Sequence, residues 1–139
     1  MVVNIYVYQT IKGPGKKEGE YCYILETIKN DKPITLTDFG HLEKMSENRA
    51  ELTVLLKALK RLVKECEVTV YGCSDHIKTG VEKWLKDWVR ADWKNAKGKE
   101  VANKEEWQQL EEIKKKYNIA VSDQKKHSYT NWMKSEIGE

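Results

Sequence analysis

The chain has 139 residues, of which 40% are hydrophobic and 34% are charged. This size and composition are typical of one globular domain with a real core, and they argue against a disordered chain. The formal net charge is only +3, which does not by itself indicate a nucleic-acid-binding protein, because the distribution of charge decides that function.

The cysteines, the apolar segments and the N-terminus indicate the cellular compartment of the protein. Cys22, Cys66 and Cys73 are an odd number of cysteines, which argues against a disulfide framework and for a reducing compartment. No apolar run approaches the roughly 20 residues of a membrane-spanning helix, and the N-terminus lacks the charged start of a signal peptide. We therefore expect a single cytoplasmic domain over residues 1–139, with no membrane partner.

Three strands are predicted in the first third of the chain. Residues 2–10 and 21–28 are rich in β-branched and aromatic side chains, and residues 34–39 alternate apolar with polar side chains, as a half-exposed strand does. Turns at residues 11–19 and 30–33 join these segments. Because the connections are short, the three strands should pair as an antiparallel meander.

The strongest helix signal covers residues 47–65. Its apolar side chains recur at helical spacing and form one broad face, made of Leu52, Leu55, Leu56, Leu59, Leu62 and Val63. Ser46 is a suitable N-cap. Glu51 lies one turn inside the helix, which places its carboxylate at the edge of the buried face. The alternative is an ordinary surface glutamate, which the helix dipole favours in a first turn.

A strand at residues 67–72 follows this helix with almost no linker, so the helix should lie antiparallel to the strand. Glu51 should then face the backbone near Cys73. The remaining predicted elements are a helical stretch at residues 74–90, a basic loop at 94–100, a helix capped by Asn103, a strand at 117–121 and a helix at 127–137. This order predicts an α/β fold with a mixed sheet covered by helical crossovers.

Several motifs resemble type 1 ribonuclease H over essentially the whole length of the chain. The most specific are Asn48-Arg49-x-Glu51-Leu52, the Gly13-Pro14-Gly15 turn, Thr79-Gly80-Val81-x-x-Trp84 through Trp93-Lys94, Asn103-Lys104, and Trp107-Gln108-x-Leu110. The resemblance implies a ribonuclease H-like, five-stranded mixed sheet with three antiparallel strands and two parallel ones, flanked by helices. It also implies a basic protrusion that grips substrate, and RNA/DNA hybrid or double-stranded RNA as the partner.

The resemblance further implies four carboxylates around two divalent metal ions, Mg²⁺ or Mn²⁺, because such ions prefer oxygen ligands. Carried over position by position, the site falls on Gln9, Glu51, Cys73 and Ser135. Only Glu51 matches the expected residue type. The first strand cannot supply a substitute, because residues 1–17 contain no Asp or Glu.

The loss of three carboxylates predicts a member of the family that binds nucleic acid and is catalytically inactive. No cofactor is expected, and at most one ion could be held by Glu51 with Asp75 or Glu136, the nearest remaining carboxylates. The first alternative is a metal-dependent hybrid ribonuclease with an altered active site, which would use Mg²⁺ or Mn²⁺. The second is a protein-interaction module that reuses the fold and binds a protein partner.

The substrate-binding surface looks better preserved than the catalytic one. From Lys83 to Lys104 there are seven Lys or Arg and three Asp or Glu residues. Lysines next to aromatic side chains suit phosphate neutralisation and apolar packing against sugars. The candidate binding residues are Lys12, Asn48, Asp75, Trp84, Trp88, Trp93, Lys94, Lys97 and Lys99. The alternative for Trp84 and Trp88, at i and i+4, is that they pack a helix onto its neighbour.

The histidines carry weaker signals. His127 resembles an auxiliary histidine that the family uses near the active site, and it is equally a plain residue at the start of a helix. Cys73-x-x-His76 lacks a second pair at suitable spacing, so it does not predict a zinc site. We expect Cys73 to be a small buried side chain at a strand end.

Overall fold

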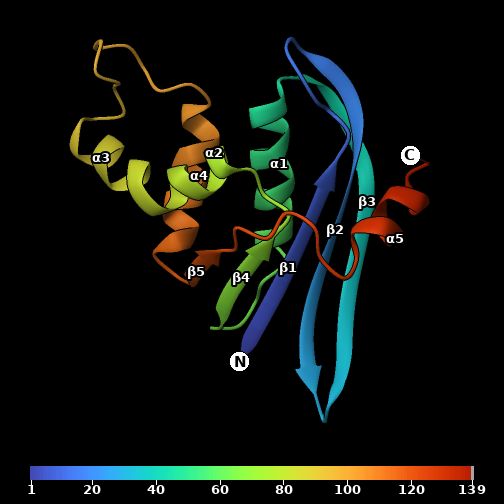
Figure 1. Cartoon of the computed structure of the whole chain (residues 1–139). Coiled ribbons are helices and arrows are strands. Elements are labelled where there is room, and N and C mark those ends of the chain that lie inside the picture. Colours follow the sequence, from blue (N-terminus) through green and yellow to red (C-terminus); the bar gives the residue numbers. More distant parts are fainter. Residues whose placement is uncertain (139) are drawn as a thin grey trace.

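The computed structural model describes residues 1–138 as one mixed five-stranded sheet with helices on both faces (Figure 1). The sheet has the strand order β3-β2-β1-β4-β5. Its strands are β1 (Val2–Gln9), β2 (Lys17–Lys29), β3 (Lys32–Met45), β4 (Glu67–Tyr71) and β5 (Asn118–Val121). The pairs β1–β2 and β2–β3 are antiparallel, whereas β1–β4 and β4–β5 are parallel. The predicted sheet is therefore confirmed.

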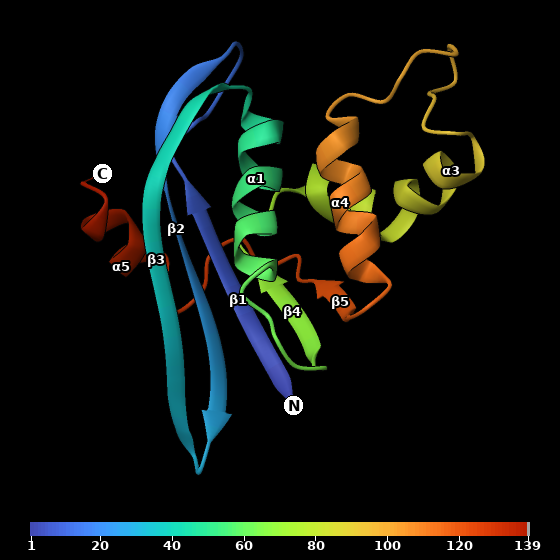
Figure 2. The ribbon, with the colours of Figure 1, turned by 180° about the vertical axis from the view of Figure 1, so that it is seen from behind.

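The helices divide between the two faces of this sheet. They are α1 (Glu47–Leu59), α2 (Asp75–Thr79), the π-helical turn η1 (Gly80–Trp84), α3 (Leu85–Arg90), α4 (Lys104–Lys114) and α5 (Thr130–Glu136). Helix α1 lies across β1 and β2 with α4 beside it, and α5 lies against the other face (Figure 2). Within residues 1–138, no helix has the length and apolar character needed to cross a membrane.

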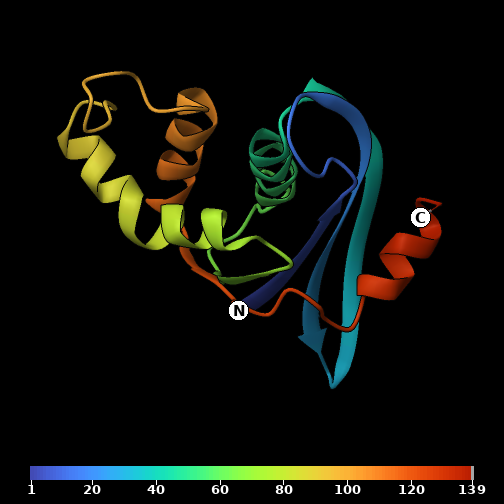
Figure 3. The ribbon, with the colours of Figure 1, turned by 45° about the horizontal axis from the view of Figure 1, so that its top comes forward.

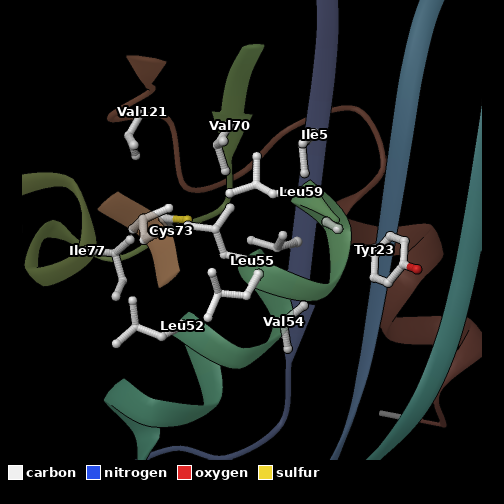
Figure 4. Packing of buried hydrophobic residues seen from close by; sticks show 14 of the residues in the cluster. Ile5, Tyr23, Leu52, Val54, Leu55, Leu59, Val70, Cys73, Ile77 and Val121 are labelled. Atoms are coloured by element: carbon white, nitrogen blue, oxygen red, sulfur yellow. The ribbon is translucent and has the colours of Figure 1, made fainter. Parts of the chain in front are cut away.

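The side chains of β1 point alternately to the two faces of the sheet, so each face carries its own hydrophobic cluster. Ile5 and Val7 point to α1 and join the main core, whereas Tyr6 points to α5 and joins a second, smaller cluster with Cys22 and Met133. In the main core, the leucines of α1 lie against β4 and α2 (Figure 4). The apolar face of α1 therefore fixes this helix, including its first turn, on the sheet.

Several predicted boundaries are wrong, and the structure gives the reasons. Helix α1 ends at Leu59 rather than at residue 65, because Arg61 and Leu62 make short i→i−3 bonds that turn the chain back toward β4. Val63, predicted on the buried face, is 89% exposed. Strands β2 and β3 are longer than predicted, because residues 17–20 pair with residues 41–45, as Glu20 does with His41.

Two predicted helix starts also differ. Asn103 precedes α4, but it has φ +59° and makes no side-chain capping bond. Helix α5 begins at Thr130 rather than at residue 127, because His127 begins a turn in which its N–H donates to the hydroxyl of Thr130. The Ser46 cap of α1 is confirmed, since its hydroxyl accepts from the Arg49 N–H at 3.3 Å.

The predicted helical stretch after β4 forms a protrusion built from α2, η1, α3 and the loop that follows. Figure 3 shows this protrusion, in yellow and orange, on the opposite side of the molecule from α5. Gly80 lets the protrusion pack closely, because a Cβ at this position would lie 2.1 Å from a ring carbon of Trp107 on α4. The π-helical turn thus begins where the helix meets the Trp107 ring.

We predict that Gly80→Ala destabilises the protein by about 1–3 kcal/mol, because the added methyl group must displace the Trp107 ring. Denaturant unfolding followed by tryptophan fluorescence measures this loss. Lys86→Ala, on the exposed surface of α3, is the control and should change stability by less than about 0.5 kcal/mol. Equal stability of the two variants would contradict the packing role of Gly80.

Candidate nucleic-acid interface and retained carboxylate

The Glu51 carboxylate joins the second turn of α1 to the start of α2. Glu51 is 8% exposed. Its Oε1 accepts from the backbone N–H of Ser74 at 3.1 Å, and its Oε2 accepts from the Ser74 hydroxyl at 2.7 Å. The same hydroxyl accepts from the Ile77 N–H and caps α2. The predicted position of Glu51, at the edge of the buried face and next to the backbone after β4, is confirmed.

Burial controls the ionisation of this site. It raises the pKa of the Glu51 carboxyl, and the two bonds from Ser74 and the charge of Lys12 oppose that rise. Burial also raises the pKa of the Cys73 thiol, with the charge of Glu51 as a second cause. Cys73 therefore stays a neutral thiol within the main core, as predicted for a small buried side chain.

Gln9 and Glu51 meet at a small cavity of about 20 Å³, which is room for about one water molecule. Its lining also includes Lys12 and Gly72. Gln9 is 3% exposed, and its Oε1 accepts from the Ile11 N–H at 2.6 Å. Its Nε2 has no hydrogen-bond partner among residues 1–138. The cavity therefore combines one carboxylate with an ammonium group and an amide donor.

The other carboxylate positions do not converge on this cavity. Ser135 is exposed on α5, and the ammonium of its neighbour Lys134 lies 5.8 Å from the centre of the Tyr8 ring. Glu136 acts on Cys22, whose pKa it helps to raise and whose side chain lies on the α5 face of the sheet. The Asp75 carboxylate is 78% exposed and forms an ion pair with Lys125 at 3.0 Å.

These residues do not fit a hard divalent cation. Mg²⁺ or Mn²⁺ needs several oxygen ligands held at short distances. Both oxygens of Glu51 accept from Ser74, and the amide oxygen of Gln9 accepts from Ile11. Cys73 offers only a neutral, soft sulfur, and the ammonium of Lys12 repels a cation.

A cluster of acidic side chains around His41 lies on the β2–β3 hairpin, and the sequence pattern did not indicate it. Ligand atoms of Glu18, His41 and Glu43 lie within 4.8 Å of one another, and all three side chains are exposed. The two ring nitrogens of His41 lie 3.0 Å from a Glu20 oxygen and 3.2 Å from a Glu18 oxygen. These hydrogen bonds raise the pKa of His41. The cluster is therefore well described as a cross-strand ion-pair network.

His127 packs beside Gly72, which lines the cavity. Its Nδ1 accepts from the Tyr129 N–H at 3.2 Å, and its ring centre lies 4.7 Å from that of Tyr6. Burial lowers its pKa. Gly72, at φ +91°, has no room for a side chain, because a Cβ would lie 2.5 Å from the Val7 carbonyl oxygen. His127 thus has a clear packing role at the turn before α5.

The tryptophans of the protrusion pack mainly on one another and on α4. The ring centres of Trp84 and Trp88 are 5.7 Å apart, those of Trp88 and Trp93 are 6.4 Å apart, and those of Trp88 and Trp107 are 5.2 Å apart. All three rings of the protrusion remain half-buried. This geometry supports the packing interpretation and gives the protrusion a rigid base.

The predicted basic residues are exposed on this base and around the cavity. Lys94, Lys97 and Lys99 are exposed, and none forms an ion pair in the part of the chain that the structure describes. The Asn95 side-chain oxygen accepts from the N–H groups of Lys97 and Lys99 and so orders the loop. Asn48 is exposed in the first turn of α1.

Comparison with known proteins agrees with this architecture. The RNase H family matches residues 4–133. Ribonuclease H of Francisella philomiragia subsp. philomiragia is 39% identical over 110 residues, which are 79% of this chain and 70% of that protein. Ribonuclease H of Francisella tularensis subsp. novicida is 36% identical over 90 residues, 65% of this chain, and the matched part spans only 59% of that relative's length.

Two solved structures share the fold at lower identity. LC9-RNase H1, described as a type 1 RNase H with the type 2 active-site motif, is similar with a TM-score of 0.77 and 16% identity, over 97% of this chain and 69% of that one. LC11-RNase H1, solved in complex with RNA/DNA hybrid, is similar with a TM-score of 0.61 and 18% identity, over 94% of this chain and 92% of that one.

We predict that Glu51→Ala lowers the stability of the fold, whereas the effect of Glu51→Gln depends on pH. Glu51→Ala should lose about 2 kcal/mol, because the half-buried N–H and hydroxyl of Ser74 lose their acceptor. Glu51→Gln keeps an acceptor and removes a carboxyl whose pKa is raised on folding. A raised pKa means that the contribution of Glu51 is fully present below its ordinary value of 4.5 and is lost as pH rises through the folded value.

The stability of Glu51→Gln relative to the wild type should therefore increase from pH 4 to neutrality, as measured by denaturant unfolding across pH. Glu65→Gln, an exposed carboxylate without an ion pair within residues 1–138, is the control. A relative stability of Glu51→Gln that decreases with pH would show that the hydrogen bonds from Ser74 lower the pKa of Glu51 more than burial raises it.

Proposed function

The chain belongs to the ribonuclease H family, and on that premise we propose that it binds RNA/DNA hybrid or double-stranded RNA without cleaving it. The observation that carries this proposal is the state of Glu51, the one carboxylate retained at the four expected positions. Both of its oxygens accept hydrogen bonds from Ser74, and its neighbour Lys12 is cationic. This arrangement stabilises the fold, and a single carboxylate beside a cation supplies little negative charge for catalytic metal ions.

Positive charge around the cavity suits a phosphodiester better than a metal ion. The ammonium of Lys12 lies 5.3 Å from the centre of the Tyr8 ring, and the ammonium of Lys134 lies 5.8 Å from the same centre. A nucleic-acid backbone at this end of β1 would find two cations without any divalent ion. Phosphate neutralisation by lysine supplies affinity that does not depend on sequence.

The protrusion supplies the second basic surface. Residues 80–100 contain six Lys or Arg and four Asp or Glu residues, and two of those acidic side chains, Glu82 and Glu100, form ion pairs with Lys78 and Lys104. The lysines of the 94–99 loop are therefore free to contact phosphates. Because the tryptophans hold this loop on α4, less ordering is needed when nucleic acid binds.

Recognition of an RNA-containing duplex also needs contacts other than phosphate. Asn48, at the exposed start of α1, carries an amide that can donate to and accept from a 2′-hydroxyl or a base edge in a shallow minor groove. Asp75 is exposed at the start of α2, where its carboxylate can accept a bond from a 2′-hydroxyl. LC11-RNase H1, which shares the fold, has been solved with RNA/DNA hybrid bound, which supports a hybrid as the first ligand to test.

The alternative function is a metal-dependent hybrid ribonuclease with an altered active site. The names of the Francisella relatives and the retention of Glu51 favour it. It requires oxygen ligands in addition to Glu51, because one carboxylate does not complete the coordination of a divalent ion. We therefore treat cleavage as an outcome that the first experiment must be able to detect.

We predict tight, salt-sensitive binding of RNA/DNA hybrid or duplex RNA that persists in EDTA and so does not require Mg²⁺. The measurement is a fluorescence titration with hybrid, duplex RNA, duplex DNA and single strands at two salt concentrations, followed by electrophoresis of the recovered probe. An intact RNA strand is the expected result. Cleavage in Mg²⁺ or Mn²⁺ that disappears in Glu51→Gln would support the enzyme instead.

We predict that combining Lys94→Gln, Lys97→Gln and Lys99→Gln weakens binding and lowers the slope of log affinity against log salt. The slope should fall by roughly 0.7–0.9 for each phosphate that the protein no longer neutralises. Lys12→Gln should lower this slope as well, because its ammonium lies at the cavity. Lys29→Gln and Lys64→Gln, exposed lysines on the β2–β3 ribbon and after α1, are the matched controls. Equal losses of affinity in the control variants would refute a localised binding surface.

A further inference from the structure

Exposed apolar side chains gather around the outer edge of the sheet. Nine large hydrophobic side chains are exposed within residues 1–138. Seven of them lie on or beside the β2–β3 hairpin, namely Met1, Ile28, Ile34, Leu36, Phe39, Val63 and Trp132. A concentration of this kind marks an interaction surface more often than scattered single residues do.

The backbone of this edge is unpaired on its outer side, and within the segment 32–38 only Pro33 has no N–H to offer. Strand β3 is the last strand of the sheet, is 14 residues long and pairs with β2 on one side only. The outer part of the β2–β3 hairpin extends beyond α5 and beyond the ends of the other strands (Figures 1 and 2). A long exposed edge strand is a template for another strand.

Hollows lie on both sides of this part of β3. On the α1 face, a hollow of about 370 Å³ is lined by Ile34 and Leu36 together with Leu62 and Val63. On the α5 face, a hollow of about 260 Å³ is lined by Thr37 and Trp132 among others. Thr35 lines both hollows. A strand added beside Thr35 could therefore place alternate side chains next to each hollow.

We propose that the occupant of this edge is a second copy of the chain, paired antiparallel through β3 about a two-fold axis at Thr35. The segment Lys32-Pro33-Ile34-Thr35-Leu36-Thr37-Asp38 is self-complementary in this register. Ile34 lies opposite Leu36 of the second copy, and Lys32 lies opposite its Asp38. Each of these pairs occurs twice, because the interface of a two-fold dimer is isologous.

The existing sheet fixes which side chains share a face. Leu36 pairs with Leu25 of β2, which belongs to the main core, so Lys32, Ile34, Leu36 and Asp38 all lie on the α1 face. Directly opposite residues of an antiparallel pair have neighbouring side chains. The two apolar pairs and the two ion pairs therefore form one continuous row across the dimer.

Charge and pattern both favour this register. Moving the axis to Leu36 would place Ile34 opposite Asp38, and moving it to Ile34 would place Lys32 opposite Leu36, so each shift mismatches an apolar and a charged side chain. Lys32 forms no ion pair within residues 1–138. Asp38 is half-exposed, is 3.7 Å from Arg61 and accepts from the Tyr23 hydroxyl at 3.3 Å. These contacts come from β2 and from the chain after α1, and Lys32 of the second copy would add a further partner to the Asp38 carboxylate.

The first test is the mass of the protein in solution, measured by sedimentation equilibrium across a concentration series. The expected result is a concentration-dependent shift from 16.3 kDa to twice that mass. Leu36→Lys should weaken dimerisation at least about thirtyfold, because it places a charge in both apolar pairs. Ile28→Lys, exposed on β2 in the same hairpin but not on the edge strand, should leave the dimer unchanged.

The second test fixes the register by cross-linking. In antiparallel pairing, directly opposite Cα atoms lie about 4.5–5.5 Å apart, within the range that a disulfide spans. Thr35→Cys should therefore form a disulfide-linked dimer under mild oxidation. Thr37→Cys should not, because Thr37 lies opposite Pro33 and about 13 Å along the strand from its own copy. The native cysteines are buried and should not interfere.

A monomeric mass at every concentration, or a Thr37→Cys dimer without a Thr35→Cys dimer, would overturn the proposal. A protein that dimerises equally in wild-type and Leu36→Lys forms would overturn it as well. The dimer does not depend on the proposed nucleic-acid binding. Repeating the hybrid titration with Leu36→Lys therefore shows whether nucleic-acid binding persists when dimerisation is lost.

Discussion

The bonds between Glu51 and Ser74 are the contact on which the architecture of the site depends. They connect the second turn of α1, which is fixed on the sheet by its leucines, to the cap of α2, from which the protrusion begins. Burial makes this carboxylate costly in its charged form, and the two hydrogen bonds compensate part of that cost. A residue type suited to metal binding is thereby used to join two helices on the same face of the sheet.

Electrostatics links this structural role to the proposed function. A site for divalent cations needs several carboxylates, and their mutual repulsion is relieved only when the ions bind. Here Gln9 and Cys73 are neutral and Lys12 is cationic, so the charge of Glu51 is balanced without an ion. The same substitution pattern that disfavours metal chemistry leaves positive charge at the end of β1, which suits a phosphodiester backbone. The proposed loss of cleavage and the proposed binding would therefore have a common physical origin.

The two ends of the sheet offer separate surfaces. Near α2 and α3, tryptophans pack on Trp107 and display the lysines of an ordered loop. At the opposite edge, β3 displays unpaired backbone and apolar side chains between two hollows. The first surface is basic and suits a polyanion, whereas the second is apolar and self-complementary. Pairing of two copies through β3 would leave both protrusions free, so one assembly could present two binding surfaces.

The sequence by itself determined the class of sheet, the helix that covers it and the absence of an acidic residue before Glu18, because these follow from local pattern and composition. It also placed Glu51 next to the chain after β4, since a short connection allows one packing direction. Only the tertiary structure decided that the oxygens of Glu51 accept from Ser74, that the tryptophans pack on α4 and that Val63 is exposed. The first two outcomes depend on contacts between residues distant in sequence, and the third depends on where α1 ends, and periodicity encodes neither.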